Sequence, residues 1–360
     1  MTTKVTVVSS QMDNAELISD GKKIWPESMR GYPTALIQAR FFSAEWSSSN
    51  EDFDSNSVQI TSKTPEGKVI TNVSRSITSD PHHFNGPLRM RSFRVLLELL
   101  NEAKRTGFND IVEISPMKLL KAAGIKPSGT GYVDIEKELI ELVTAQFEIS
   151  SNSALPNLSS LISYLDTGKV SINSDQGEVT RTNYSSRRFS KWKFCIGPVL
   201  ELLLNQTPLA RVNPNILESI GRSPLKLWLY SFYSTHGGDG NLIFKYSIKK
   251  LLDVSGIKQS IEWRTKNKGL LESDSDMRSL QNKYFSKALR EQVYRLRKAI
   301  SWLSRLRIFQ NIQIEQGKAE ELPVSSQNVL VYVSRFISDF EQELWSLPIR
   351  ARIRYLKQPL

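Results

Sequence analysis

Cysteine, histidine and long apolar runs are almost absent from this chain of 360 residues. Its one cysteine, Cys195, allows no disulfide within the chain and indicates a reducing compartment. Because Cys195 lies in an apolar run, we expect an inert core thiol rather than a nucleophile. The sequence shows no signal peptide and no apolar run of about 18 residues, so we expect a cytoplasmic protein that does not contact membranes.

The three histidines form no metal-binding pattern. His82 and His83 are adjacent, and on a strand they would point to opposite faces, so they would not share a metal ion. His236 precedes two glycines and is typical of the last turn of a helix. The glycine-rich stretch Gly124–Gly131 lacks the lysine of a phosphate-binding loop. Nothing favours a Ser/His/Asp site either, and we predict a protein that is not an enzyme and has no cofactor and no metal.

Positive charge, in contrast, is abundant. The chain has 48 lysines and arginines against 37 acidic residues, which gives a net charge of +11. The surplus gathers in Arg181–Lys193, in Lys245–Lys268, in Met277–Arg307 and in the last dozen residues. A charge of this size favours an anionic partner such as nucleic acid.

The stretch Met277–Arg307 carries the most one-sided charge. It contains one acidic residue, Glu291, and nine basic ones: Arg278, Lys283, Lys287, Arg290, Arg295, Arg297, Lys298, Arg305 and Arg307. Its apolar residues recur every three or four positions, which is the period of one helix face: Phe285, Leu289, Val293, Leu296, Ile300 and Leu303. A solvated helix usually mixes charges of both signs. The pattern therefore predicts a helix with a core-facing side and a cationic side suited to a DNA groove.

A short duplication organises the rest of the chain. Val112–Lys126 and Phe244–Lys258 share seven of fifteen residues at a constant offset of 132. A helix that begins with Pro-Leu and a basic residue precedes each copy, at Pro87 and at Pro224. A long amphipathic helix and strand pairs follow each copy. The order predicts a predominantly helical α+β chain of two tandem winged helix-turn-helix domains, whose third helix enters the major groove.

The domain boundaries follow from this repeat. We expect a flexible N-terminal arm over residues 1–32, a first winged-helix domain over 33–185, a second over 186–340 and a basic tail over 341–360. The strand Lys191–Ile196 then opens the second domain, and the polar stretch Ser174–Arg188 forms a mobile loop. Val58–Ser62 and Val69–Val73 flank a Pro-Glu-Gly turn and predict a hairpin.

The two predicted third helices differ in charge. The one in the first domain carries Asp134, Glu136, Glu138 and Glu141 against Lys137 alone. Because phosphate repels an acidic surface, we expect the second domain to read bases. The first domain would serve dimerisation, with Arg89, Arg91 and Arg94 touching the DNA backbone.

Three segments resemble a known family: Leu36–Trp46, Gly86–Leu100 and Val112–Ile149. Over Pro33 to Val333 the chain resembles the replication initiators of iteron-bearing, theta-replicating bacterial plasmids, and among these the TrfA type. The resemblance implies a protein that binds direct repeats at a plasmid origin, promotes melting of an adjacent AT-rich region and recruits the host initiator and replicative helicase. It also implies a monomer–dimer equilibrium and a part in plasmid copy control.

The resemblance further implies that the third helix of the second domain reads bases in double-stranded DNA. Carried onto this chain, the base-reading residues are Lys283, Tyr284, Lys287, Arg290, Glu291 and Tyr294, with Arg297 and Lys298 beside them. Arginine and lysine can bind guanine, and glutamate can accept from cytosine. The basic residues around this helix would hold phosphates: Lys249, Lys250, Lys258, Arg264, Lys266 and Lys268.

Two other functions stay open at this stage. A winged-helix transcriptional regulator without a replication role would use the same contacts. A rolling-circle nicking initiator would need a tyrosine and a metal; the chain has 11 tyrosines but no spaced histidine pair.

Overall fold

The structure is a computed structural model of the full chain. It describes residues 5–7, 25–44, 57–64, 67–76, 84, 88–108, 110–151, 154–168, 170–174, 178–181, 191–235, 243–257, 261, 275–305, 309–317 and 328–335. These residues divide into two compact units. Unit 1 comprises residues 1–42 and 53–214, and unit 2 comprises residues 43–52 and 215–360. The boundary at Pro214 differs from the sequence-based one at 185/186.

Unit 1 begins with a segment that packs onto its core. Trp25 and Tyr32 are buried there. The sequence assigned these residues to a flexible arm, and for 25–32 that prediction is wrong because the aromatic side chains find apolar partners. Tyr32 belongs to β2 (Arg30–Pro33), which pairs with the later strand β14 (Leu209–Val212). The helix α1 (Ala35–Gln38) and the short strand β3 (Phe42–Ser43) follow.

The first five-stranded sheet of unit 1 has the order β1-β4-β5-β8-β9. Its strands are β1 (Val5–Val7), β4 (Ser57–Thr64), β5 (Gly67–Arg75), β8 (Gln146–Ser151) and β9 (Ala154–Ser160). The predicted hairpin is confirmed, because β4 and β5 pair antiparallel with Val58 opposite Val73.

The second five-stranded sheet has the order β12-β11-β10-β13-β7. Its strands are β7 (Val112–Ile114), β10 (Ile162–Asp166), β11 (Val170–Asn173), β12 (Glu178–Arg181) and β13 (Trp192–Ile196). Strand β13 pairs with β7, with Trp192 opposite Ile114, so it belongs to unit 1 and does not open the second domain. Residues 178–181 form a strand where the sequence indicated a loop.

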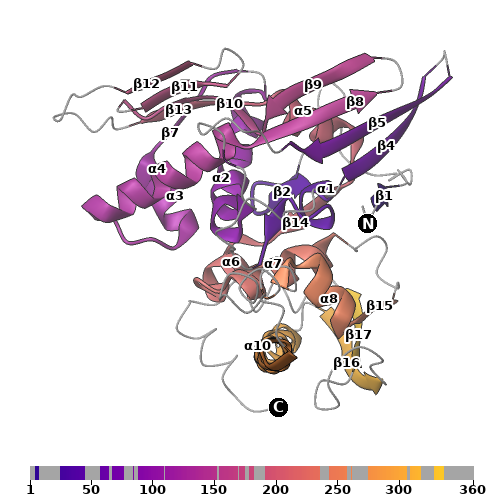
Figure 1. The fold of residues 1–360 in the computed structure, drawn as a ribbon. Coiled ribbons are helices and arrows are strands. Elements are labelled where there is room, and N and C mark those ends of the chain that lie inside the picture. Colours follow the sequence, from indigo (N-terminus) through magenta and orange to yellow (C-terminus); the bar gives the residue numbers. More distant parts are fainter. Residues whose placement is uncertain are drawn as a thin grey trace. The chain divides into compact units, whose positions relative to one another are not determined.

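Helices α2 (Met90–Thr106), α3 (Pro116–Ala123) and α4 (Gly129–Thr144) lie together beside this sheet (Figure 1). Helix α2 supplies most of the core through its fully buried stripe, which includes Phe93, Leu96 and Leu100. Gly107 ends α2 with φ 121°, a conformation that glycine adopts without strain. A shorter helix, α5 (Pro198–Gln206), completes the unit.

Unit 2 has a simpler plan. Its elements run, in chain order, α6 (Pro214–Ile220), α7 (Pro224–Ser234), β15 (Ile243–Ser247), α8 (Ile248–Val254), α10 (Ser275–Arg305), β16 (Phe309–Gly317) and β17 (Asn328–Arg335). The strands form an antiparallel sheet of order β15-β17-β16. Helix α10 contacts α7, and Figure 1 shows it nearly end-on.

The duplicated segments fold alike. Each copy is a strand followed by a short helix, and each helix ends at a glycine with positive φ, 70° at Gly124 and 77° at Gly256. The amide of each glycine donates to the carbonyl three residues earlier, at 3.1 Å and 3.2 Å. Leu119 and its counterpart Leu251 are both fully buried. The shared residues are therefore those that end the helix and fill the core.

The described part of the chain mixes helices and strands. The predicted α+β composition is confirmed, since two five-stranded sheets accompany the helices of unit 1, and among the described elements the helices hold more residues than the strands. Within the described ranges, no helix combines the length and apolar character that crossing a membrane requires.

Candidate nucleic-acid interface

Helix α10 has two faces, as its sequence predicted. Leu289, Val293, Leu296, Ile300 and Leu303 are buried at spacings of three and four residues. The side chains of Lys287, Arg290, Glu291, Tyr294, Arg295 and Lys298 are exposed. The predicted orientation is confirmed for residues 287–303. A buried stripe of this width fixes the rotation of the helix, so the cationic side faces outward.

Helix α7 provides the surface against which α10 packs. Pro224 begins α7, and the Ser223 hydroxyl accepts a hydrogen bond from the amide of Lys226 at 3.4 Å. The rings of Trp228 and Phe232 stack at 4.7 Å between centroids. The ammonium of Lys226 lies 4.5 Å from the ring centre of Trp302 on α10, and burial lowers the pKa of Lys226. This aromatic packing supports the outward face from behind.

The exposed face carries positive charge beside one aromatic ring. The ammonium of Lys298 lies 4.5 Å from the ring centre of Tyr294, one helical turn away. Tyr294 is 57% exposed, so much of the residue stays open to solvent despite the cation–π contact. At about 1.5 Å of rise per residue, Lys287 and Lys298 lie about 16 Å apart along the helix axis, the length of about five base pairs.

The other predicted contacts divide into three groups. Arg297 is half-buried at the edge of the exposed face. Four residues have backbone positions within helices but side chains outside the described part, namely Lys283 and Tyr284 in α10 and Lys249 and Lys250 in α8. Four basic residues lie wholly outside the described residues: Lys258, Arg264, Lys266 and Lys268.

The three arginines predicted to contact DNA from unit 1 are engaged inside the protein. Arg94 is 5% exposed and lies in the core. Arg91 donates from Nε to Glu138 Oε1 at 2.5 Å, and Arg89 pairs with Glu141. Carboxylates of α4 bind the guanidinium groups of Arg89 and Arg91, whose side chains are still 32% and 37% exposed, so their contact with the DNA backbone stays a prediction. The burial of Arg94 argues against such a contact for that residue.

The same contacts change the electrostatics of α4. Glu138 is fully buried, where it binds Arg91 and the Ser92 hydroxyl. Glu141 is also buried, and burial together with the neighbouring Glu138 raises the pKa of Glu141. Two of the four acidic residues that were expected to repel phosphate from the surface of α4, Glu138 and Glu141, are therefore not on that surface.

A signal for this arrangement was present in the sequence. Glu138 lies three residues after Ile135 and four before Leu142, which places it on the apolar stripe of its helix. A carboxylate at such a position needs a buried cationic partner. Asp134 and Glu136 are half-buried, and Glu136 accepts a hydrogen bond from the Thr167 hydroxyl at 2.6 Å.

Among the residues that the structure describes, no group of three or more His, Cys, Asp and Glu side chains could hold a metal ion. Cys195 on β13 is half-buried rather than fully enclosed, and its thiol donates to the Ile196 carbonyl at 3.6 Å. The three histidines lie outside the described ranges.

The comparisons with known proteins gave only structural matches. No protein-family model and no curated protein matches the chain. The chain is similar to two crystal structures of domains 2 and 3 of RctB, both at 12% identity, with TM-scores of 0.43 and 0.42. These cover 85% and 86% of this chain and 99% of the RctB chains. It is also similar to the Pi initiator protein in complex with iteron DNA, at 11% identity and TM-score 0.40, over 70% of this chain and 92% of that one.

Proposed function

We propose that the protein binds double-stranded DNA in a sequence-specific way and acts as the initiator of plasmid replication, with direct repeats at the origin as its target. The observation that carries the proposal is the outward cationic face of α10. Lys287, Arg290 and Lys298 are exposed on it, while a continuous apolar stripe fixes the opposite side. Such a helix can enter the major groove and present its side chains to base edges.

The order of elements in the two units supports tandem winged helices. Unit 2 follows the plan helix, strand, helix, helix and two strands, in α7, β15, α8, α10, β16 and β17. Unit 1 repeats this plan from α2 to β9. In unit 2 the first strand of the plan, β15, pairs with the wing strand β17, whereas its counterpart β7 in unit 1 pairs with β13 in a separate sheet. The proposed wing of unit 1, β8 and β9, is part of a larger sheet because β8 also pairs with β5.

The finer parts of the proposal rest on the family resemblance of the sequence. They are melting of the adjacent AT-rich region, recruitment of the host initiator and helicase, a monomer–dimer equilibrium and a cytoplasmic location. We also propose that the protein works without enzymatic chemistry, through binding alone. A covalent adduct between the protein and supercoiled plasmid in the presence of Mg²⁺ would contradict this part.

Two substitutions test the role of α10. Lys287→Ala and Arg290→Ala should each weaken binding to the cognate repeat by about 1–3 kcal/mol and reduce discrimination against mutated repeats. The measurement is a titration of the purified variants against cognate and scrambled duplexes. Lys121→Ala is the matched control, because it removes one exposed lysine from α3 of unit 1.

Equal losses on cognate and scrambled DNA would show that Lys287 and Arg290 hold phosphates and do not read bases. A transcriptional regulator would give the same binding data as an initiator. Maintenance of a plasmid that carries only the repeat array as its origin separates the two, because a regulator would not support its replication.

A further inference from the structure

The segment Trp25–Arg30, which we call the N-terminal strap, is held against the C-terminal end of α2. Trp25 is buried beside Phe108, with 6.3 Å between ring centroids. The ring also lies directly on the backbone of Gly31, where an added Cβ would come within 2.2 Å of it. Lys104 closes the contact, since its ammonium donates to the Trp25 carbonyl at 3.1 Å. One aromatic ring thus anchors the strap.

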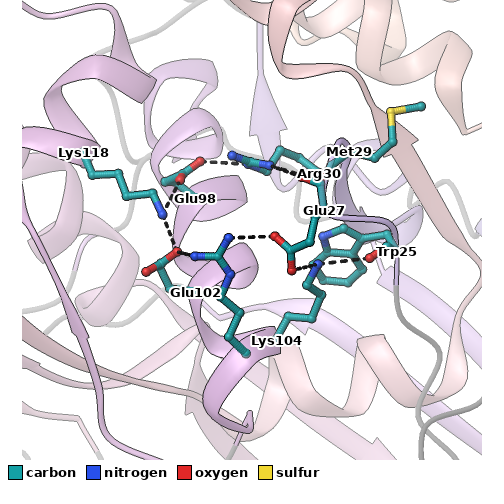
Figure 2. A network of polar contacts seen from close by, with 9 residues as sticks. Trp25, Glu27, Met29, Arg30, Glu98, Glu102, Lys104 and Lys118 are labelled. Atoms are coloured by element: carbon teal, nitrogen blue, oxygen red, sulfur yellow. Dashed lines mark hydrogen bonds and ion pairs between the residues drawn. The ribbon is translucent and has the colours of Figure 1, made fainter.

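The remaining contacts of the strap are ionic (Figure 2). Glu27 bridges Lys104 at 2.9 Å and Arg105 at 2.7 Å. Arg30 pairs with Glu98 at 2.9 Å, and its other guanidinium nitrogen donates to the Glu27 carbonyl at 3.2 Å. The strap therefore supplies the Glu27 carboxylate to Lys104 and Arg105 of α2, and the Arg30 guanidinium to Glu98 of the same helix.

The network continues from α2 to α3. Glu102 accepts from Arg105 at 3.2 Å and also binds Lys118 on α3. Lys118 lies 3.2 Å from Glu98 as well. An alternating series of negative and positive side chains thus runs from Glu27 to α3, the second of the three neighbouring helices α2, α3 and α4. Arg105 is thus shared between Glu27 and Glu102, and Glu102 is shared between Arg105 and Lys118.

One ion pair of the strap is exposed to solvent. The side chains of Glu27 and Arg105 are 58% and 51% exposed, so water and salt screen their attraction. The indole N–H of the buried Trp25 has no hydrogen-bond partner in the described structure, which reduces the gain from burying the ring. When the strap is closed, Glu27 neutralises the positive charge at the end of α2.

We propose that the N-terminal strap is an autoinhibitory contact, in which Glu27 competes with an external polyanion for Lys104 and Arg105. In the closed state, Glu27 neutralises Lys104 and Arg105 at the end of α2, and the same ionic network holds Lys118 of α3. A phosphate chain that binds Lys104 and Arg105 replaces Glu27 and shifts the population toward the open strap. This inference rests on the proposed function for its polyanion, which is duplex DNA.

Hydrogen exchange on the full chain tests the strap, first without DNA. Glu27→Gln should raise exchange of the amides in residues 25–33 and 116–123 by about two- to fivefold, because it removes the ion pairs of Glu27 with Lys104 and with the exposed Arg105. Glu113→Gln is the matched control, because it removes one exposed pair, with Lys191, elsewhere in unit 1. Equal exchange in the two variants over these segments would overturn the proposal.

The same measurement with an added duplex that carries the direct repeats separates the strap from the proposed function. The expected result is slower exchange in α10 and faster exchange in residues 25–33. Slower exchange in α10, combined with unchanged or slower exchange in residues 25–33, would overturn the proposal that the strap is autoinhibitory and would leave the proposed function standing. No change in either segment would overturn both.

Discussion

Glu138 shows at the scale of one residue how unit 1 is assembled. Its carboxylate is fully buried between α4 and α2, and Arg91 is its main cationic partner. Arg91→Ala should lower the free energy of unfolding by about 3 kcal/mol, because it leaves a buried charge with little compensation. Urea denaturation measures this loss. Lys191→Ala, which breaks an exposed pair, should cost about 1 kcal/mol or less, and similar losses for both would contradict the account.

The ion pairs of Glu27 should make the stability of the fold depend on pH. Hydrogen bonds from Arg105 and Lys104 lower the pKa of Glu27 from 4.5 to about 2. A group with a lowered folded-state pKa stabilises the fold above its unfolded pKa and loses that effect as the pH falls through the folded value. The difference in urea midpoint between the wild type and Glu27→Gln should therefore be constant above pH 5 and shrink between about pH 4.5 and pH 2. A difference that does not change with pH would contradict the network.

Single residues also mark the limit of sequence reasoning. The exposure of Lys287 and Arg290 could be predicted, because helix periodicity fixes which side faces the core. The pairing of Arg89 and Arg91 with carboxylates of α4 could not be predicted from charge alone. Their partners Glu138 and Glu141 lie about fifty residues away, and only the packing of α2 on α4 brings the charges together.

At the scale of elements, α10 depends on its apolar stripe. Leu296→Ala should lower the free energy of unfolding by about 2–5 kcal/mol, because Leu296 is fully buried and truncation leaves a cavity. Tyr294→Ala, two residues earlier and 57% exposed, should change stability by about 0.5 kcal/mol or less. Urea denaturation of the two variants compares them. A larger loss for Tyr294→Ala would show that the helix is rotated away from the orientation described.

Elements defined by local pattern could be predicted, and those defined by distant pairing could not. The hairpin of β4 and β5 follows from alternation around a turn, and the repeat marks the end of α3 at Gly124. Strand β13 was assigned to the wrong unit because its partner β7 lies almost eighty residues earlier. Alternation identifies a strand but not the strand with which it pairs.

At the scale of the whole molecule, the two units share a plan and differ in charge. In unit 1, Arg91 of α2 and the preceding Arg89 pair with Glu138 and Glu141 of α4. In unit 2 the exposed face of α10 holds several cations with Glu291 as the one acid between Lys287 and Lys298. The net charge of +11 is therefore available to an outside partner mainly through unit 2 and the basic segments around it.

The most direct measurement is the affinity of the purified protein for an array of direct repeats from its own origin, compared with random duplex, over a range of salt concentrations. The account predicts tighter binding to the array by about a thousandfold or more and a steep loss of affinity with salt, about 0.9 log units per log unit of salt for each phosphate contacted. Equal affinity for the array and for random duplex at every salt concentration would contradict it.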